Sequence, residues 1–403
     1  MTAKAEPQSA FWRLAAFAAR HCAWHADQSW TARLIRGAAL DVNDLPLLGK
    51  DTVRESPAAL TARTAAPGHD ARLWVYTSGS TGMPLGVLKS RRQAAIEEQE
   101  ACRLKQSWHD VLPGPHLIVR CETANEPFGT CQQRQAIDGT LVVSVYGLET
   151  TLIADTIERI GAGSVHTWPS VARSLLAPAR DPNALSSLRA FTTRAEVLLP
   201  ELRERLAIER DWRVLDVYGA NEVGVLAVEC ADCGYYHTAE RSALVEVLHD
   251  DGRPAAPGEI GRVVATPLYS YAMPLLRYAL GDLALVAEPT ACSGGRLTLA
   301  RILGRDRHIF LTPQGRPFVP MLHPLRLVGL PLRQFKLVQI DAAVIEFHYV
   351  PYPDAVIDPV ALQALAIESM PAGFEIRLRQ VANIAAAPSG KYFMHERLFE
   401  DGL

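Results

Sequence analysis

The pattern that most constrains this chain is the alternation of strand-like and helix-like stretches before residue 220. Short β-branched or apolar runs, such as Leu73 to Tyr76 and Val214 to Tyr218, read as strands. Longer stretches with a helical pattern, such as Arg91 to Trp108 and Leu198 to Glu209, fall between such runs. This alternation is typical of an α/β sheet with crossover helices.

The pattern changes near Ser242, where strand-like runs follow one another directly. Ala243 to Leu248 and Gly261 to Thr266 read as strands, and the stretch His249 to Gly252 after the first of them reads as a tight turn. We therefore expect a β-rich subdomain after the α/β portion.

The C-terminal part has a third pattern. Residues 344–349 read as a strand, 359–370 as a helix and 374–381 as a strand, which together make a compact β-α-β unit. A stretch of about 95 residues is large enough for a separate small domain. The sequence therefore predicts a large N-terminal α/β domain with a β-rich subdomain, residues 1–306, and a small α+β domain, residues 307–403.

Composition excludes several classes of protein. Apolar residues make up 48% of the chain and charged residues 21%, which is ordinary for a globular protein and excludes a mainly disordered chain. No run approaches the roughly 18 apolar residues of a membrane-spanning helix, and the N-terminus lacks the features of a signal peptide. The net charge of −3 gives no reason to expect nucleic acid. We expect a soluble, cytoplasmic protein that binds neither nucleic acid nor a membrane.

The most informative stretch is YTSGSTGMPLGV, which runs from Tyr76 to Val87. Its glycines let the backbone approach a ligand closely, and its hydroxyls and amides can donate hydrogen bonds to phosphate oxygens. It is not a Walker loop, because the lysine that such a loop requires is absent. The alternative is a surface turn rich in serine and glycine. The candidate phosphate-binding residues are Ser78, Gly79, Ser80, Thr81 and Gly82.

This loop resembles the phosphate loop of the acyl-adenylate-forming superfamily, which includes acyl-CoA synthetases, peptide-synthetase adenylation domains and luciferases. Within that superfamily the chain is most similar to the phenylacetate–CoA ligase-like branch. Further motifs resemble that branch and follow in the same order. They are LPLLGK at 45–50, RAE at 194–196, YGANE at 218–222, AMPLLRYALGD at 272–282, RILGR at 301–305 and SGK at 389–391.

The resemblance implies an enzyme that joins a carboxylic acid to AMP, releases pyrophosphate and then passes the acyl group to a nucleophile. Lys391 would reach the forming acyl-phosphate oxygen, and Glu222, after a strand and a Tyr-Gly turn, would ligate Mg²⁺. Tyr218 would lie against the adenine of ATP, and Asp282 would accept hydrogen bonds from both ribose hydroxyls. The remaining nucleotide-binding positions are Glu196, Gly219, Ala220, Asn221 and Arg305.

Each of these roles has a plainer alternative. Glu222 could be a solvated turn carboxylate, Asp282 half of a salt bridge, and Lys391 a solvated lysine. Lysine is scarce in this chain, which has six lysines among its 41 basic residues, and this makes a merely solvated Lys391 less expected than usual.

The resemblance also implies a mobile small domain that rotates between adenylation and acyl transfer. The hinge falls on Arg307, where the family usually has Asp or Lys. The chain departs from the family elsewhere too. Leu85 replaces a lysine common in the superfamily, Arg194-Ala195 replaces a glycine pair, and Asn221 replaces Thr or Ser. These departures suggest a specialised member of the branch.

A zinc site is the second prediction from the sequence. Cys230 and Cys233 form a C-x₂-C pair, His237 follows, and Cys292 lies farther along. Three thiolates and an imidazole would complete a tetrahedral zinc shell, and several relatives in the branch carry a comparable cluster. A closed shell of four protein ligands indicates a structural zinc. The alternative is four unrelated residues or a reduced, buried pair of cysteines.

The acyl pocket is expected near Trp168, with Phe128 and His166 as further lining residues. A tryptophan there suits an aromatic or small acid, although core packing explains a buried tryptophan equally well. The acceptor would be a thiol, either coenzyme A or a carrier protein, or else an amine. Activation of a non-carboxylate oxyacid, a nucleotide-binding regulatory protein without catalysis, and a homodimer all stay open.

Overall fold

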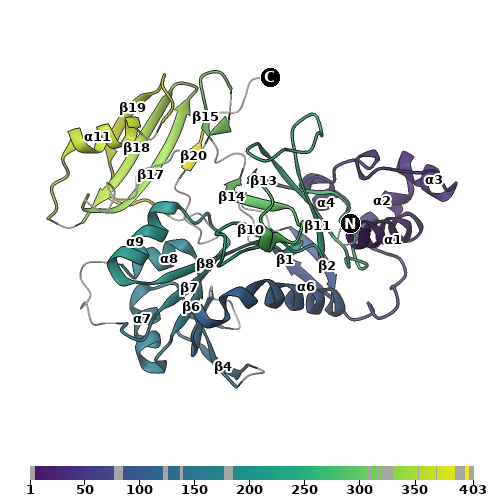
Figure 1. Cartoon of the computed structure of the whole chain (residues 1–403), viewed down its shortest axis with the longest axis horizontal. Helices are drawn as coiled ribbons and strands as arrows, with labels where there is room; N and C mark the ends of the chain where they lie inside the picture. Colours follow the sequence, from purple (N-terminus) through teal and green to yellow (C-terminus); the bar gives the residue numbers. More distant parts are fainter. Residues whose placement is uncertain are drawn as a thin grey trace. The chain divides into compact units, whose positions relative to one another are not determined.

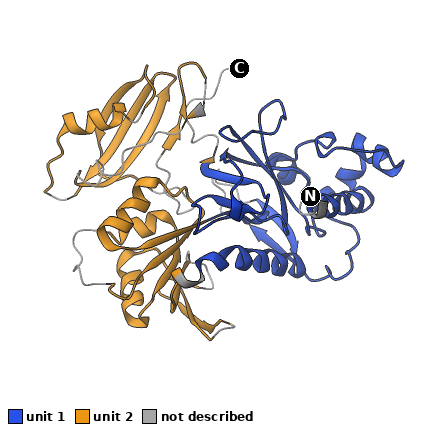
Figure 2. Cartoon of the chain, in the orientation of Figure 1, with its two compact units in different colours: residues 1–108, 217–303 blue, residues 109–216, 304–403 orange. Residues whose placement is uncertain are grey.

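The computed structural model of the chain divides it into two compact units. The first comprises Met1–Trp108 and Val217–Leu303, and the second His109–Asp216 and Gly304–Leu403 (Figure 2). The described residues are 5–76, 85–120, 126–136, 139–176, 185–305, 310–315, 317–318, 330–352, 354–368, 370–385 and 395–398. Among them, no helix combines the length and the apolar composition needed to cross a bilayer.

The strands of the first unit follow the order β11-β12-β13-β14-β10-β9-β8. The pairs β11–β12, β12–β13, β9–β10 and β8–β9 are antiparallel. Their bounds are β8 (Arg213–Ala220, of which 217–220 belong to this unit), β9 (Gly224–Glu229), β10 (Tyr236–Thr238), β11 (Ala243–Leu248), β12 (Ile260–Pro267), β13 (Tyr278–Val286) and β14 (Thr298–Arg305). A separate antiparallel pair is formed by β1 (Arg72–Tyr76) and β2 (Gly86–Ser90).

The helices of the first unit are mostly short. They are α1 (Ala5–His21), α2 (Ala23–Ala26), α3 (Ser29–Ile35), α4 (Lys50–Glu55), α5 (Pro57–Leu60) and α6 (Arg91–Leu104). Helix α1 buries Phe11, Leu14 and Ala18 in one cluster with Trp30 and Leu276, because residues at this spacing share one helix face. Helix α6 packs against β2 and β9, and Figure 1 shows it running beside β2.

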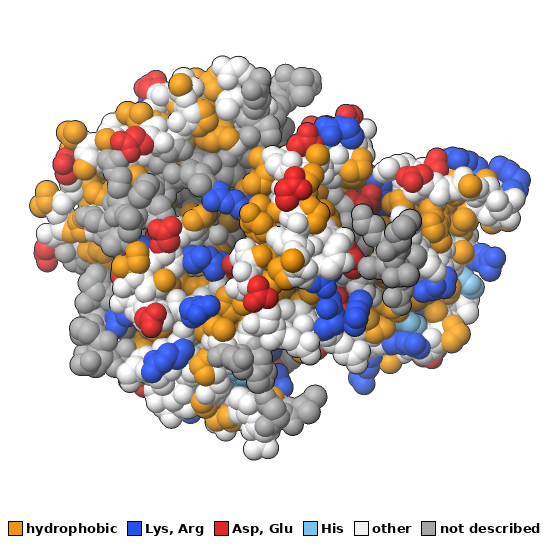
Figure 3. Space-filling model, viewed as in Figure 1, with side chains coloured by type: hydrophobic (Ala, Val, Ile, Leu, Met, Phe, Trp, Pro, Cys, Tyr) orange, Lys and Arg blue, Asp and Glu red, His pale blue; other side chains and the backbone are white. Residues whose placement is uncertain are grey.

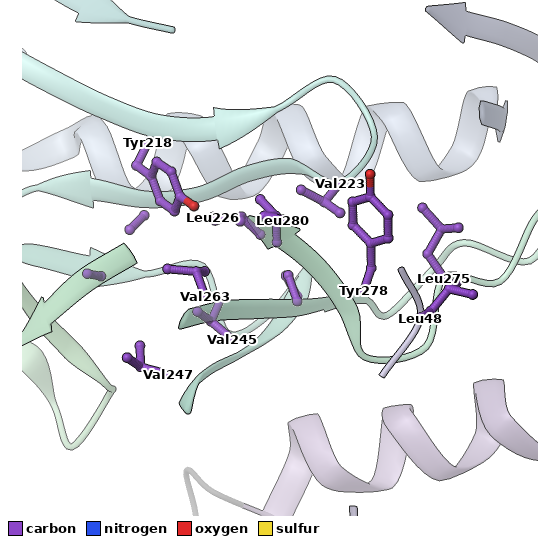
Figure 4. Close-up of a cluster of buried hydrophobic side chains, with 14 of the residues drawn as sticks. Leu48, Tyr218, Val223, Leu226, Val245, Val247, Val263, Leu275, Tyr278 and Leu280 are labelled. Carbon is purple, nitrogen blue, oxygen red and sulfur yellow. The ribbon is translucent and has the colours of Figure 1, made fainter. Parts of the chain in front are cut away.

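The main apolar core of this unit joins the strands that carry several of the candidate residues (Figure 4). Leu226 of β9, Val263 of β12 and Leu280 of β13 are at most 1% exposed. The rings of Tyr218 and Tyr278 belong to the same cluster. Their burial therefore fixes where the two phenolic hydroxyls lie.

The second unit contains a mainly parallel sheet with the order β7-β6-β3-β5-β4. The pairs β3–β5, β3–β6 and β6–β7 are parallel, and the edge strand β4 is antiparallel. The strands are β3 (His116–Arg120), β4 (Cys131–Gln135), β5 (Leu141–Tyr146), β6 (Ser164–Thr167) and β7 (Ala190–Arg194), and the helices are α7 (Thr150–Ile160), α8 (Pro169–Ser174) and α9 (Pro200–Arg210). A buried apolar cluster of its own joins β3, β5, β6 and β7 with the three helices, whereas every residue of β4 is exposed.

The C-terminal part of the second unit forms a four-stranded sheet with the order β19-β18-β17-β20. Helix α11 covers the apolar core of this sheet, in which Leu337, Phe347 and Leu362 are fully buried. The elements are β15 (Phe310–Leu311), β16 (Pro317–Phe318), β17 (Leu332–Asp341), β18 (Val344–Pro351), α11 (Pro359–Glu368), β19 (Glu375–Gln380) and β20 (His395–Arg397).

These elements confirm the predicted α/β class and most of the predicted segments. Strand β11 coincides with its prediction, and α11 ends at Glu368, two residues early. The helix predicted to reach Trp108 ends at Leu104 and continues as a 3₁₀ helix, Lys105–Val111. The predicted domain boundary, between residues 306 and 307, lies outside the described residues and stays a prediction.

A buried histidine makes stability depend on pH. His25 is 1% exposed, and its Nε2 contacts the Pro274 carbonyl at 2.9 Å. Burial lowers the pKa of His25 from 6.5 to about 4. Between these values the unfolded chain binds a proton that the folded chain does not, so stability falls as the pH drops from 6.5 to 4, by up to about 3 kcal/mol.

We expect His25→Gln to remove this component of the pH dependence, because glutamine keeps a donor for the Pro274 carbonyl but does not titrate. Urea unfolding of the wild type and of His25→Gln at pH 7 and pH 4.5 measures how much stability each protein loses on acidification. Equal losses of stability on acidification in the two proteins would show that His25 is not the cause.

Candidate nucleotide-binding site and metal cluster

The candidate phosphate loop connects β1 to β2. The strands on either side of it pair antiparallel, with Tyr76 opposite Gly86. The side-chain amide of Asn221 donates a 3.0 Å hydrogen bond to the Tyr76 carbonyl, which ties the base of the loop to the YGANE segment. The predicted phosphate-binding residues themselves lie outside the described residues: Ser78, Gly79, Ser80, Thr81 and Gly82.

The YGANE segment forms the end of β8 and the turn into β9. The expected Tyr-Gly turn before Glu222 is not observed, because Tyr218, Gly219 and Ala220 all belong to β8. Instead, Gly219 allows β8 and β9 to approach each other closely, because a Cβ added at this position would lie 2.4 Å from the Gly224 carbonyl oxygen. The turn comes two residues later and is closed by the Val223 amide, which donates to the Ala220 carbonyl at 3.1 Å.

Tyr218 and Asp282 are brought together although 64 residues separate them. The Tyr218 hydroxyl donates a 2.8 Å hydrogen bond to Oδ2 of Asp282, and both residues are buried. Each carboxylate oxygen can accept more than one hydrogen bond, so this contact orients Asp282 without exhausting its acceptors. The two residues predicted for the adenine and the ribose therefore form one polar contact between β8 and β13.

Glu222 is a buried carboxylate at the turn between β8 and β9. It is 4% exposed, and its Oε1 accepts a hydrogen bond from the Tyr278 hydroxyl at 3.2 Å. Within the described part of the chain, no ion pair neutralises it. A buried carboxylate without a cation is costly, and carboxylate oxygens are ligands that Mg²⁺ prefers. The donor set at this turn therefore fits a divalent cation.

Glu196 belongs to the second unit and contacts the start of α8. Its two carboxylate oxygens accept hydrogen bonds from the Ser170 amide at 2.9 Å and the Ser170 hydroxyl at 3.0 Å. The preceding residue, Ala195, has a left-handed backbone with φ of +68°, a conformation that favours glycine. Alanine therefore adopts this turn at some cost in backbone strain.

The three predicted pocket residues lie in the second unit in different surroundings. Trp168 precedes α8 and packs against the apolar cluster of this unit, which agrees with the core-packing alternative. His166 is on β6, with its ring 5.8 Å from that of His116. Phe128 is half exposed and packs close to Gly147. Their role in an acyl pocket stays a prediction.

Three further predicted residues cannot be placed. Lys391 and Arg307 lie outside the described residues, and for Arg305 only the backbone, at the end of β14, is described. Their roles stay predictions.

The predicted zinc ligands form one compact cluster in the first unit. The ligand atoms of Cys230, Cys233, His237 and Cys292 all lie within 4.8 Å of one another. The Cys230 and Cys292 sulfurs are 3.8 Å apart, and His237 Nε2 is 3.4 Å from Cys233 Sγ and 3.7 Å from Cys292 Sγ. A tetrahedron with Zn–S bonds of about 2.3 Å and a Zn–N bond of about 2.0 Å has edges of roughly 3.5–3.8 Å. The cluster thus has the dimensions of a zinc shell.

The surroundings of the cluster affect the protonation of its members. Burial raises the pKa of the Cys230 thiol to about 11, and the Thr290 hydroxyl lowers the pKa of Cys292. Burial also lowers the pKa of His237, which keeps the imidazole neutral as metal binding requires. The Arg296 guanidinium lies 3.3 Å from His237 Nδ1 and 3.1 Å from the Cys292 carbonyl. Its positive charge would offset the net negative charge of three thiolates around Zn²⁺.

Two features of this site were not anticipated from the sequence. One is Tyr278, whose hydroxyl donates a hydrogen bond to Glu222. The sequence feature that could have indicated a role for Tyr278 is its position within the AMPLLRYALGD motif. The other is a buried ion pair between Lys89 and Glu97 beneath the Glu222 turn. No pattern in the sequence pairs those two residues.

Curated relatives match parts of this chain. A phenylacetate–coenzyme A ligase of Thermus thermophilus is 32% identical over 177 residues, which are 41% of this chain and 39% of that protein. A probable non-canonical nonribosomal peptide synthetase of Salinispora arenicola is 28% identical over 261 residues, which are 62% of this chain and 3% of that protein. The chain therefore spans well under half the length of either relative.

Solved structures match most of the chain. The crystal structure of 2-hydroxyisobutyryl-CoA ligase in the postadenylation state, in complex with 2-HIB-AMP, has a TM-score of 0.74 and 15% identity. That alignment covers 99% of this chain and 90% of the ligase. An anthranilate CoA ligase in complex with anthranoyl-AMP has a TM-score of 0.62 and 16% identity, with 85% and 68% covered. At these identities the likeness establishes the fold.

Residues 13–266, more than half of the chain, match the family described as AMP-binding enzyme. The fold agrees, and the resemblance to the acyl-adenylate-forming superfamily and its phenylacetate–CoA ligase-like branch is confirmed. The chain belongs to the AMP-binding enzyme family.

Proposed function

We propose that this protein uses ATP to convert a carboxylic acid into an acyl-adenylate and then transfers the acyl group to a thiol. The observations that carry the proposal are two buried polar contacts, Tyr218 with Asp282 and Tyr278 with Glu222, in a chain of the AMP-binding enzyme family. An aromatic or small acid is the proposed substrate, since the curated ligase that resembles this chain is named for phenylacetate.

The reaction joins two anions, so positioning and charge compensation are what the protein supplies. A carboxylate oxygen of the acid attacks the α-phosphorus of ATP, and the bond to pyrophosphate breaks. Asp282, oriented by Tyr218, would accept hydrogen bonds from the ribose, while Lys391 would donate to the charged oxygens at the reacting centre. Glu222 would hold Mg²⁺, which neutralises phosphate charge when bound.

In the second step the thiol sulfur attacks the acyl carbon and AMP leaves. Coenzyme A is the first candidate acceptor, because one curated relative and the solved structures are named as CoA ligases. A carrier-protein thiol is the second candidate, and the similarity to a probable peptide synthetase favours it. Both acceptors present the same nucleophilic atom, so the chemistry at the acyl carbon is shared.

We also propose that Cys230, Cys233, His237 and Cys292 bind one structural Zn²⁺. The edge lengths of the cluster and the neutral imidazole support this assignment. With zinc on His237 Nε2, the proton would reside on Nδ1, and Arg296 would turn towards the Cys292 carbonyl that it already contacts. The ion would hold the end of β9 and the start of β10 to the 3₁₀ turn Ala291–Ser293.

Acid-dependent exchange of labelled pyrophosphate into ATP tests the proposed activity. A panel of aromatic and short aliphatic acids, with non-carboxylate oxyacids in separate reactions, identifies what the protein activates. Exchange with a carboxylic acid supports the proposal. Tight ATP binding without exchange for any acid would favour a nucleotide-binding regulatory protein instead.

Asp282→Asn should raise the KM for ATP more than the KM for the acid. Removing the charge from a buried acceptor costs about 1.5–3 kcal/mol, which corresponds to a rise of roughly 10- to 150-fold in KM for ATP. The KM for the acid should stay within about twofold of wild type.

Asp216→Asn is the matched control for this substitution. Asp216 is also buried on β8 and accepts a 2.6 Å hydrogen bond from Thr193, so its loss should lower stability without raising KM for ATP. Similar KM values for ATP in both variants would refute the ribose role of Asp282.

A further inference from the structure

A buried ion pair lies beside the turn that carries Glu222. Lys89 Nζ of β2 and Glu97 Oε2 of α6 are 2.7 Å apart, and their side chains are only 5% and 11% exposed. Burying two charges has a desolvation cost that often cancels their attraction, so an apolar pair of similar volume would give equal or greater stability. Stability alone therefore gives no reason for this pair.

The Glu97 carboxylate is held on both of its oxygens. Lys89 occupies Oε2, and the side-chain amide of Gln93, one turn earlier on α6, donates to Oε1 at 2.9 Å. Gln93 is itself 1% exposed, and its backbone amide donates to the Ser90 hydroxyl that caps the helix. These contacts hold the Glu97 carboxylate in one position.

This fixed carboxylate touches the backbone of the Glu222 turn. A Cβ added at Gly224 would lie 2.5 Å from both Cδ and Oε2 of Glu97. Gly224 has φ of +80°, follows Glu222 by two residues and pairs with Ala220 across the hairpin. Only a glycine here lets the turn rest directly on the carboxylate.

The other side of the ion pair belongs to the strand that leaves the candidate phosphate loop. Lys89 lies opposite Leu73 in the β1–β2 pair, and the opposite end of the same pair borders the loop. That end is already tied to the Glu222 turn through Asn221 and the Tyr76 carbonyl. The strand pair and the turn are therefore joined at two places, once by an amide and once by the ion pair.

We propose that Lys89 and Glu97 are positioning residues that hold the Glu222 turn at a fixed distance from the strands flanking the phosphate loop. The inference rests on the proposed function, because it assigns the pair to the binding of magnesium and ATP. Neither residue touches the nucleotide; both act through the backbone at Gly224 and so through the direction of the Glu222 carboxylate.

The test measures ATP affinity as a function of Mg²⁺ concentration by calorimetry, without any acid. The variants are Lys89→Met, Glu97→Gln and the double variant Lys89→Met/Glu97→Leu. Each should raise the Mg²⁺ concentration needed for half-maximal ATP affinity about tenfold, since groups behind a metal ligand typically change metal affinity 10- to 100-fold. Lys89→Arg should recover most of the wild-type response, because it keeps a cation beside Glu97.

The double variant separates positioning from stability. It replaces both charges by apolar side chains, so thermal unfolding should return close to that of wild type while the weakened Mg²⁺ response persists. Glu201→Gln is the stability control, since Glu201 is also a buried carboxylate in an ion pair, 2.8 Å from Arg173 in the second unit. It should unfold more easily yet keep the wild-type Mg²⁺ response.

Two results would overturn the inference. One is an unchanged Mg²⁺ response in Lys89→Met and Glu97→Gln, and the other is an ATP affinity of wild type that does not respond to Mg²⁺ at all. The proposed function fails separately, through the absence of pyrophosphate exchange with every acid. Because ATP binding is measured without acid, the two failures are distinguishable.

Discussion

Lys391→Ala is expected to lower the rate of acid-dependent pyrophosphate exchange about 100- to 1,000-fold. The SGK motif at 389–391 resembles the family's C-terminal motif, whose lysine donates to the forming acyl-phosphate oxygen. Loss of one such donor, which acts on charge that develops only in the transition state, typically costs this factor. Because the lysine would act mainly in the transition state, kcat should fall with little change in KM for ATP.

Lys336→Ala is the matched control for that experiment. Lys336 lies on β17 of the small C-terminal sheet and pairs with Glu396 at 2.6 Å, so its loss removes one partly exposed ion pair, and it belongs to none of the motifs that resemble the family. It should leave the exchange rate within about twofold of wild type. Full exchange activity in Lys391→Ala would mean that another cation compensates the transition-state charge.

Removal of zinc is expected to destabilise the first unit strongly. Structural zinc contributes on the order of 10 kcal/mol in small zinc-binding peptides, and the cluster here joins residues on or next to β9, β10 and the 3₁₀ turn at 291–293. We expect one Zn²⁺ per chain by elemental analysis. Cys233→Ser should lose that zinc and lower the free energy of unfolding by several kcal/mol.

Cys102→Ser is the control for the zinc experiment, because Cys102 is an exposed thiol on α6 outside the cluster. It should retain one Zn²⁺ per chain and wild-type stability. A wild-type protein with reduced thiols and no bound zinc after expression in zinc-supplemented medium would contradict the assignment, and so would a Cys233→Ser variant as stable as wild type.

Local patterns predicted much of the fold. In β11 every second residue from Ala243 to Val247 belongs to the apolar core because one face of the strand meets it, and the strand has the predicted bounds. Proline at the start and small apolar residues after it predicted the helix that begins at Pro359. The candidate zinc ligands could also be grouped from the sequence, and the structure brings Cys230, Cys233, His237 and Cys292 together.

Features that depend on contacts between distant segments could not be predicted. A turn was expected at Tyr218-Gly219, but the strand continues because Gly219 fits against the carbonyl of Gly224 on the returning strand. The pairing of Tyr218 with Asp282 depends on how β8 and β13 lie in one core, which no local pattern encodes. The same holds for Lys89 and Glu97, which form an ion pair between β2 and α6 that no local pattern encodes.

The most direct test of the central claim follows an oxygen atom. An acid that supports exchange is labelled with ¹⁸O in its carboxylate and incubated with the protein, ATP and hydroxylamine, which captures the activated acyl group whatever the natural acceptor is. If the acid attacks the α-phosphorus and the acyl carbon is captured later, one ¹⁸O must appear in AMP, together with unlabelled pyrophosphate. Unlabelled AMP, or ADP in place of AMP, would contradict formation of an acyl-adenylate.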